Sequence, residues 1–192
     1  MALSKINIRN AALFIMILIA VSFRFVDLGE NYQWANFTPV GAIALFAGTY
    51  FNDRIKAFAV PLCILLLSDV LLMHKYTGSF NPYYDGIIFI YLSFAAMVYI
   101  GTLIKKVNVT NILFASLASV LIHWLLTDIE PWLSNPAYNR DITGYFQSLL
   151  AAIPFEKSLL FGNLVFGALL YGGFELAKSR FSVLKQQDKL AY

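Results

Sequence analysis

The sequence predicts an all-α integral membrane protein, and two features of its composition lead to this fold class. Of the 192 residues, 59% are hydrophobic and only 13% are charged, against roughly 25% charged residues in a typical soluble domain. The mean hydropathy of +0.68 agrees with this. The length is that of one transmembrane domain, residues 1–192. The net charge is only +3, so we expect no nucleic-acid partner.

Six apolar stretches are candidates for membrane-spanning helices. A bilayer core is about 30 Å thick, so an upright helix needs roughly 20 mostly apolar residues. The second stretch is shorter than this, and we expect it to be tilted, to thin the bilayer or to be shielded by neighbouring helices. The stretches are Ala11 to Phe25, Pro39 to Phe51, Ala57 to Met73, Ile87 to Ile104, Val109 to Thr127 and Ser158 to Leu176.

Two regions of the predicted six-span arrangement need further comment: the first apolar stretch and the last outer connection. Lys5 and Arg9 precede the first stretch, and small residues at 20–22 follow, so a cleaved signal peptide is an alternative there. The last outer connection runs from about Asp128 to Lys157, and within it, in Asp141–Phe155, apolar residues recur at three- or four-residue spacing. We expect an additional amphipathic helix here, capped by Asp141 and ended by Pro154, that lies on the membrane surface or covers a cavity.

The basic residues predict the orientation. If the N-terminus lies inside, ten Lys and Arg residues fall on the inner side and four on the outer side, as the positive-inside rule requires. We therefore expect a multi-pass protein of the bacterial cytoplasmic (inner) membrane, surrounded by lipid, with both termini in the cytoplasm. The inner residues are Lys5, Arg9, Arg54, Lys56, Lys105, Lys106, Lys178, Arg180, Lys185 and Lys189, and the outer ones are Arg24, Lys75, Arg140 and Lys157.

Aromatic residues gather on the outer side. All three tryptophans, Trp34, Trp124 and Trp132, belong to the outer connections or lie one turn below them. An interfacial aromatic belt would account for them without a ligand. However, a belt should mark both faces, and the inner turns hold few aromatic residues. We therefore favour an aromatic-lined pocket that opens on the outer side.

Three spans carry a polar residue at similar depth near their outer ends: Asp69, His123 and Asn163. Polar groups inside a membrane usually face the bundle interior or a water-filled cavity, so their convergence indicates a pocket. Structural roles remain open at this point. Asp69 is also placed to pair with Arg24 or Lys75, and His123 to bond Asp69 or Thr127.

Several catalytic motifs are absent from the sequence. It holds no P-loop, no H-E-x-x-H and no G-x-S-x-G, and its two histidines are far apart. These absences argue against an enzyme and give no reason to expect a cofactor. The single cysteine, Cys63, rules out an intramolecular disulfide and is most simply a small buried hydrophobic residue.

The segment from Asn36 to Asp69, NFTPVGAIALFAGTYFNDRIKAFAVPLCILLLSD, resembles a bacterial membrane family of mostly uncharacterised proteins. That family is similar to the substrate-binding S-components of energy-coupling factor (ECF) vitamin transporters, and its nearest characterised relatives are BtuM-type cobalamin transporters. The resemblance implies a six-helix bundle that binds a vitamin-like molecule on the outer side. It also implies an ATP-driven energy-coupling module, carried by other chains, as a partner.

The resemblance also suggests roles for individual residues. It places Asp69 at the edge of the pocket and matches Tyr83 or Tyr84 to a ligand-contacting tyrosine. BtuM-type proteins ligate cobalt with a cysteine in the loop after the third helix. Here the segment His74–Gly86 has no cysteine, which leaves His74 as a conceivable cobalt ligand.

We therefore expect a substrate-binding membrane subunit for uptake of a vitamin or vitamin-like small molecule, with cobalamin-type compounds as one candidate. Two alternatives stay open: a membrane-embedded enzyme that uses Asp69 and His123 as acid and base, and a structural membrane protein without a ligand. The candidate substrate-binding residues are Phe37, Asp69, Tyr83, Tyr84, His123, Trp124 and Asn163.

Overall fold

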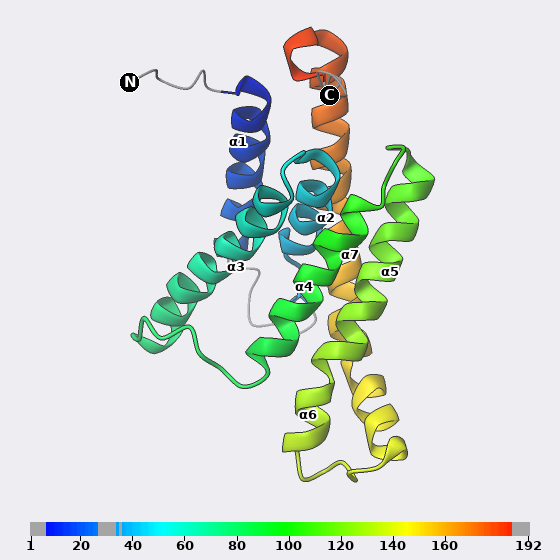
Figure 1. Cartoon of the computed structure of the whole chain (residues 1–192). Helices are drawn as coiled ribbons and strands as arrows, with labels where there is room; N and C mark the ends of the chain where they lie inside the picture. Colours follow the sequence, from blue (N-terminus) through cyan, green and yellow to red (C-terminus); the bar gives the residue numbers. More distant parts are fainter. Residues whose placement is uncertain (1–6, 27–33, 35, 186–192) are drawn as a thin grey trace.

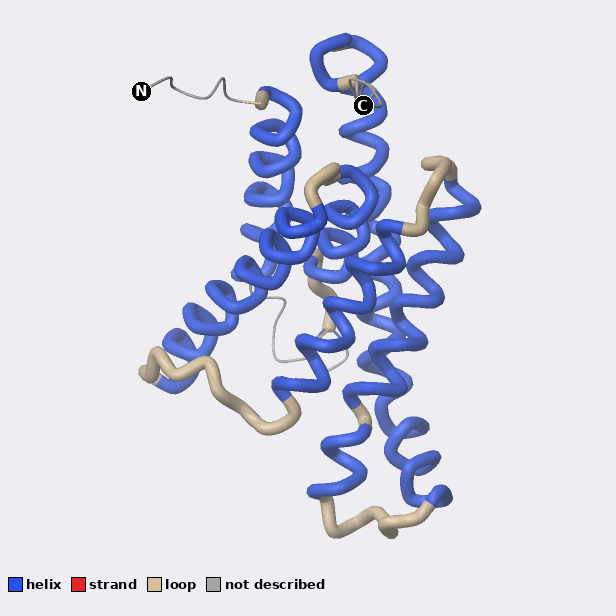
Figure 2. The backbone as a smooth tube through the Cα atoms, in the orientation of Figure 1, coloured by secondary structure: helices blue, strands red, loops and turns tan. Residues whose placement is uncertain are grey.

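The computed structural model describes residues 7–26, 34 and 36–185. Lys5 and Lys189, from the predicted inner side, lie outside the described residues. Every regular element in the described part is helical, which confirms the all-α fold class (Figures 1 and 2). The elements are α1 (Ile8–Ser22), η1 (Phe23–Phe25), α2 (Val40–Tyr50), α3 (Arg54–Thr77), α4 (Ile87–Thr102), α5 (Val109–Thr127), α6 (Ile129–Ser134), α7 (Ile142–Arg180) and η3 (Ser182–Leu184).

Within the described residues, four helical segments are long and apolar enough to cross a membrane. They are Ile8–Phe25, Arg54–Thr77, Val109–Ser134 and Ile142–Arg180. Their outward surfaces carry large apolar side chains that are more than half exposed, among them Ile15, Leu67 and Leu121. Such surfaces suit lipid rather than water. The chain is therefore a membrane-embedded helical protein.

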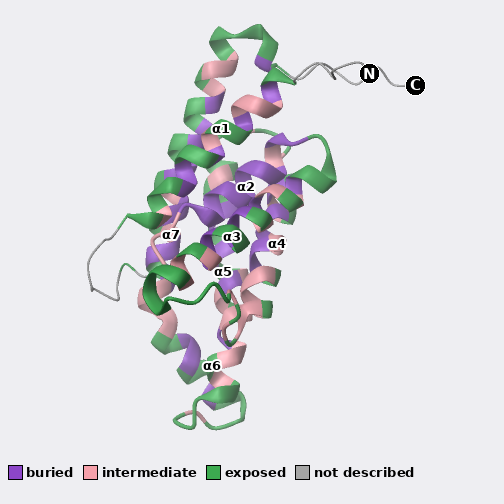
Figure 3. Ribbon diagram, turned by 90° about the vertical axis from the view of Figure 1, so that its left-hand side faces the viewer, coloured by how far each residue is buried: buried purple, intermediate pink, exposed green. Residues whose placement is uncertain are grey.

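Helix α2 lies at the centre of the bundle, where it contacts α1, α3, α4, α5 and α7. Ten of its 11 residues are buried, and Figure 3 shows the buried residues concentrated around it. Glycines bring α4 close: a Cβ atom on Gly48 would lie 2.1 Å from the carbonyl oxygen of Val98. Because other helices surround α2, its short length leaves little backbone exposed to lipid. Of the three expectations for the short stretch, the structure shows shielding by neighbours.

Local sequence signals explain where several helices begin and end. The Asp53 carboxylate accepts a hydrogen bond from the backbone N–H of Ile55 at 2.8 Å and starts α3. Asp141 accepts from the N–H of Gly144 at 2.8 Å, so its predicted role as a cap is confirmed. Helix α3 ends at Gly78, whose φ of 74° is the left-handed conformation that glycine adopts without strain.

The predicted end of a helix at Pro154 is wrong. Residues 142–155 are helical, but they form the first part of α7, which continues through Pro154 as one helix of 39 residues. Proline removes one backbone donor and leaves the carbonyl four residues earlier without its usual partner. Helix packing compensates for this loss, since α5 and α6 both contact α7. A further short helix, α6, precedes this segment and was not expected.

The helix ends gather at two opposite ends of the bundle. The start of α1, the end of α7 and the connections α2–α3 and α4–α5 lie toward the top of Figure 1. The connections α3–α4 and α6–α7 lie toward the bottom. This arrangement groups the loops as the charge pattern grouped them. The direction in which the bundle crosses a membrane stays a prediction.

Candidate functional site

A cavity of about 720 Å³ is lined in part by residues of the α3–α4 and α6–α7 connections, Tyr84 and Tyr138. This volume is typical of small-molecule sites, which occupy roughly 300–1,000 Å³. Residues from η1, the segment before α2, and helices α3 to α7 form its walls. Its aromatic lining consists of Phe23, Trp34, Phe37, Tyr76, Tyr84, Phe94, Tyr138 and Phe155.

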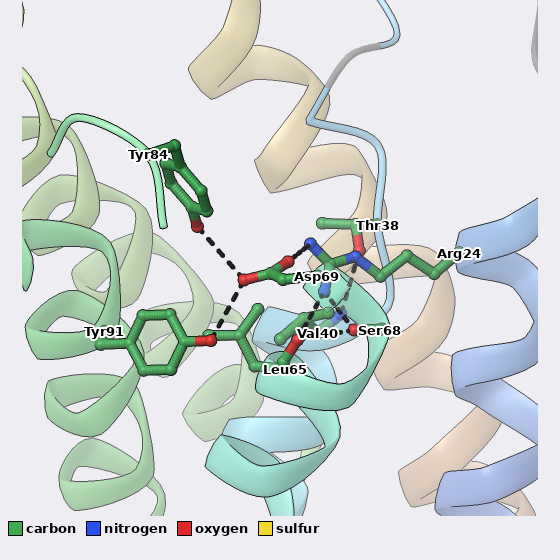
Figure 4. Close-up of polar contacts among 8 residues, drawn as sticks. All are labelled: Arg24, Thr38, Val40, Leu65, Ser68, Asp69, Tyr84 and Tyr91. Carbon is green, nitrogen blue, oxygen red and sulfur yellow. Dashed lines mark hydrogen bonds and ion pairs between the residues drawn. The ribbon is translucent and has the colours of Figure 1, made fainter. Parts of the chain in front are cut away.

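An ion pair supports one wall of this cavity. The Nη2 atom of Arg24, on η1, lies 2.5 Å from Oδ1 of Asp69, on α3 (Figure 4). The Nη1 atom of Arg24 donates to the Ser68 hydroxyl and to the carbonyl oxygen of Leu65. Asp69 is only 6% exposed and does not itself line the cavity. Instead, it holds Arg24, which does.

Two tyrosines complete the shell around Asp69. The hydroxyls of Tyr84 and Tyr91 each donate to Oδ2 of Asp69 at 3.2 Å. Burial, and then the negative charge of Asp69, raise the pKa of Tyr84 far above its usual range, so its phenol keeps the proton that it donates. Both carboxylate oxygens of Asp69 are therefore engaged, one by a guanidinium and one by two phenols. An acid–base role for Asp69 would require these bonds to break.

A second polar pair lies in the part of the cavity wall formed by α5 and α7. The Nδ1 atom of His123, on α5, lies 2.9 Å from Oε1 of Glu156, on α7. Both residues are buried, at 7% and 5% exposure, and both line the cavity. The Phe94 ring packs against the imidazole at a right-angled tilt, with centroids 5.8 Å apart. His123 thus pairs with Glu156, and Thr127 lies at the longer distance of 3.5 Å.

Side-chain bonds tie the short helix α6 and the start of α7 to the end of α5. Ser148 donates to the Asp128 carboxylate at 2.9 Å, and both residues line the cavity. The Tyr145 hydroxyl donates to the carbonyl of Leu125 at 2.6 Å. These bonds hold the start of α7 against the end of α5 and the residue from which α6 begins, so this part of the cavity has a defined wall.

The predicted site residues fall into two groups. Phe37, Tyr84 and His123 line the cavity, while Asp69 lies directly behind its wall. Tyr83 is 69% exposed and belongs to the outer surface of the α3–α4 connection. It does not line the cavity in the described part of the chain.

Trp124 and Asn163 also lie outside the cavity lining. The Trp124 indole donates to the carbonyl of Leu149 at 2.9 Å, so it joins α5 to α7. Asn163 is fully buried against Gly41, where a Cβ atom would lie 2.1 Å from the amide oxygen of Asn163. Neither polar atom of the Asn163 amide has a hydrogen-bond partner among the described residues. Both side chains serve packing between helices in this structure.

Sequence reasoning missed the acidic residues of the cavity wall, Glu156 and Asp128. Glu156 fell in the outer connection because the last apolar stretch was predicted to begin at Ser158. A signal for it exists in the sequence: Leu149, Ala152, Glu156 and Asn163 recur at spacings of three, four and seven across Pro154. That spacing indicates one continuous helix with Glu156 on its inner face.

The described residues contain no group of three or more His, Cys, Asp and Glu side chains that is placed to hold a metal ion. His74, the conceivable cobalt ligand, is exposed, and its ring stacks on Phe80 with centroids 3.8 Å apart. Cys63 is exposed on α3 rather than buried, so the prediction of a buried cysteine is wrong.

Comparison with known proteins gives one match. The model of a family of unknown function, DUF6580, matches residues 4–186. The chain belongs to the DUF6580 family. No curated protein and no solved structure matches it. The relation of this family to S-components stays a prediction.

Proposed function

We propose that this DUF6580 protein is a substrate-binding membrane subunit for uptake of a vitamin or vitamin-like small molecule. The observation that carries the proposal is the aromatic-lined cavity at one end of the bundle, with buried polar groups in two parts of its wall. Aromatic faces stack on flat heterocycles, and a few buried polar groups orient a ligand among them. Both features suit a small, flat, polar molecule.

The size of the cavity and its chemistry favour a molecule smaller than a complete cobalamin. A cobalt ligand is the feature that a corrinoid site of this kind would require, and His74 stacks on Phe80 outside the lining. The histidine that does line the cavity, His123, is already bonded to Glu156. We therefore propose a heterocycle of ordinary vitamin size as the substrate class.

The proposed membrane arrangement has six spans. The shorter helices α2 and α4 join the four long helical segments, and α2 tolerates its length because it is enclosed. With the charge bias of the loops, the bundle crosses the inner membrane with both termini in the cytoplasm and the cavity facing outward. Uptake would then use an ATP-driven module on other chains, because this sequence has no P-loop.

Ligand binding by the purified protein tests the proposal. We expect a small molecule to co-purify, to be identified by mass spectrometry and to raise the thermal midpoint of the protein. His123→Ala should weaken its binding about tenfold or more, because the Glu156 carboxylate in the cavity wall would lose the partner that holds it. Neighbouring tyrosines give a matched control: Tyr84→Ala should weaken binding, whereas Tyr83→Ala, at an exposed position, should not. Equal effects of the two changes would contradict the proposed site.

A second candidate function is a membrane-embedded enzyme, and one observation favours it. The His123–Glu156 pair lies in the cavity wall and resembles an oriented base, whereas both oxygens of Asp69 are bonded to other residues, namely Arg24, Tyr84 and Tyr91. The enzyme would lose turnover on His123→Ala while it kept binding. A structural protein without a ligand would show neither a co-purified molecule nor a change in thermal midpoint.

A further inference from the structure

The Glu156 carboxylate has one oxygen that is left without a partner. Oε1 is 2.9 Å from Nδ1 of His123. Oε2 is buried and meets no hydrogen-bond donor among the described residues. Glu156 is 5% exposed and lines the cavity. A buried carboxylate oxygen is costly without a donor, so a donor supplied by a ligand would satisfy it.

The charges on the cavity wall are unbalanced. Among the described lining residues, the charged side chains are Arg24, Asp128 and Glu156. Arg24 is neutralised by Asp69, which lies behind it. Asp128 accepts a hydrogen bond from the neutral Ser148 hydroxyl, which does not cancel its charge. The two acidic side chains therefore leave this wall negative, and a proton on His123 would cancel only one of their two charges.

An anionic ligand would find no unpaired cation among the described residues of this wall. The described donors of Arg24 point to Asp69, Ser68 and the carbonyl of Leu65, so this guanidinium is already engaged. A cation, in contrast, would meet the open oxygen of Glu156. It would also lie among aromatic rings, including Phe94 beside His123, whose faces attract positive charge.

We propose that the ligand of this cavity is a cationic or amino-substituted nitrogen heterocycle whose N–H group donates to Oε2 of Glu156. This inference rests on the proposed function and names the substrate class of the same site. His123 acts as a positioning residue, because its bond to Oε1 holds the carboxylate and turns Oε2 toward the ligand. Arg24 and Tyr84, which also line the cavity, then contact the uncharged part of the ligand.

The test uses the full chain in lipid nanodiscs and three probes that share one ring: pyridoxamine, pyridoxine and 4-pyridoxate. They carry an ammonium, a neutral hydroxymethyl and a carboxylate group at the same position. Calorimetry should show that pyridoxamine binds at least tenfold more tightly than pyridoxine and that 4-pyridoxate binds weakest. Any molecule that co-purifies should likewise be a cation or carry an N–H donor.

Substitution of the carboxylate then tests its role directly. Glu156→Gln keeps the shape of the side chain and removes the charge, so it should abolish the preference for pyridoxamine over pyridoxine. Because this preference is a ratio within one variant, a loss of folded protein does not imitate it. Asp85→Asn is the matched control, since it removes an equal charge from the exposed surface of the α3–α4 connection. It should leave the preference unchanged.

The possible failures are distinguishable. A co-purified anion without an N–H donor, or a preference for pyridoxamine that survives Glu156→Gln, would overturn this inference and leave the proposed function standing. If no molecule co-purifies and no probe binds, the proposed function itself is contradicted, and the inference fails with it.

Discussion

Arg24 and Asp69 form an ion pair with 2.5 Å between Nη2 and Oδ1, although 45 residues separate them in the chain. The pair joins the turn after α1 to α3, and the hydroxyls of Tyr84 and Tyr91 extend it to the start of α4. This cluster therefore determines how three separate elements meet beside the cavity. The main role of this cluster is structural. Only Arg24 and Tyr84 among its ion-paired and tyrosine members line the cavity, so only they can contact a ligand directly.

Breaking this pair should destabilise the protein. Asp69→Ala leaves the Arg24 guanidinium without its counter-ion, and loss of one partner of a buried pair costs about 3 kcal/mol. The Arg24 side chain that remains is 18% exposed, so water offsets part of this cost. The reverse change, Arg24→Ala, leaves the Asp69 carboxylate unpaired at 6% exposure and should cost at least as much. The free energy of unfolding, measured by SDS titration in micelles, reports the effect.

The double variant Arg24→Met, Asp69→Leu provides the decisive comparison. It should lose less stability than the sum of the two single changes, because it leaves no uncompensated charge. Lys75→Ala is the control, since Lys75 is exposed and lies over the Tyr76 ring rather than near the carboxylate. Additive single effects would show that Arg24 and Asp69 do not act as a pair.

The close approach of α2 and α4 should make Gly48 intolerant of a side chain. A Cβ atom at this position would lie 2.1 Å from the backbone oxygen of Val98, and backbone cannot move aside as a side chain can. Gly48→Ala should therefore lower the free energy of unfolding by about 1–3 kcal/mol. Gly172→Ala is the matched control, because nothing lies within 4 Å of the added atom. Equal stability of the two variants would refute the packing of α2 against α4.

Trp124 should matter for stability rather than for binding. Trp124→Phe keeps an aromatic ring but removes the indole N–H that donates to the Leu149 carbonyl. The loss should lower the free energy of unfolding by about 1 kcal/mol, the usual value of one hydrogen bond. Ligand affinity, measured on the folded fraction, should stay within twofold. A tenfold loss of affinity would place Trp124 in the site after all.

The orientation can be measured with single cysteines, because Cys63 is the only natural one. In a Cys63→Ala background, Ala137→Cys lies in the exposed α6–α7 connection and Lys105→Cys in the exposed α4–α5 connection. A membrane-impermeant maleimide should label position 137 in spheroplasts and position 105 only after lysis. The opposite pattern would mean that the cavity faces the cytoplasm.

Much of the fold could be predicted from local features of the sequence. Long apolar runs and few charges predict helices in a membrane, and the run Val109 to Thr127 coincides with α5. The cap at Asp141 was equally local, because it needs only a carboxylate and a backbone N–H three residues later. Such features depend only on residues close together in the chain, so they can be predicted from the sequence without the tertiary structure.

The tertiary structure alone decided which polar side chains meet. Asp69 and His123 were predicted to lie near the same pocket, but their partners depend on how each helix is rotated and tilted. Arg24 engages Asp69, whereas Glu156, 33 residues after His123, engages the histidine. The continuity of α7 through Pro154 was likewise decided by packing against α5 and α6, because intrinsic propensity at a proline favours a break. The sequence thus determined that buried polar groups face one end of the bundle, while the packing of helices determined that one buried oxygen of Glu156 has no hydrogen-bond partner among the described residues.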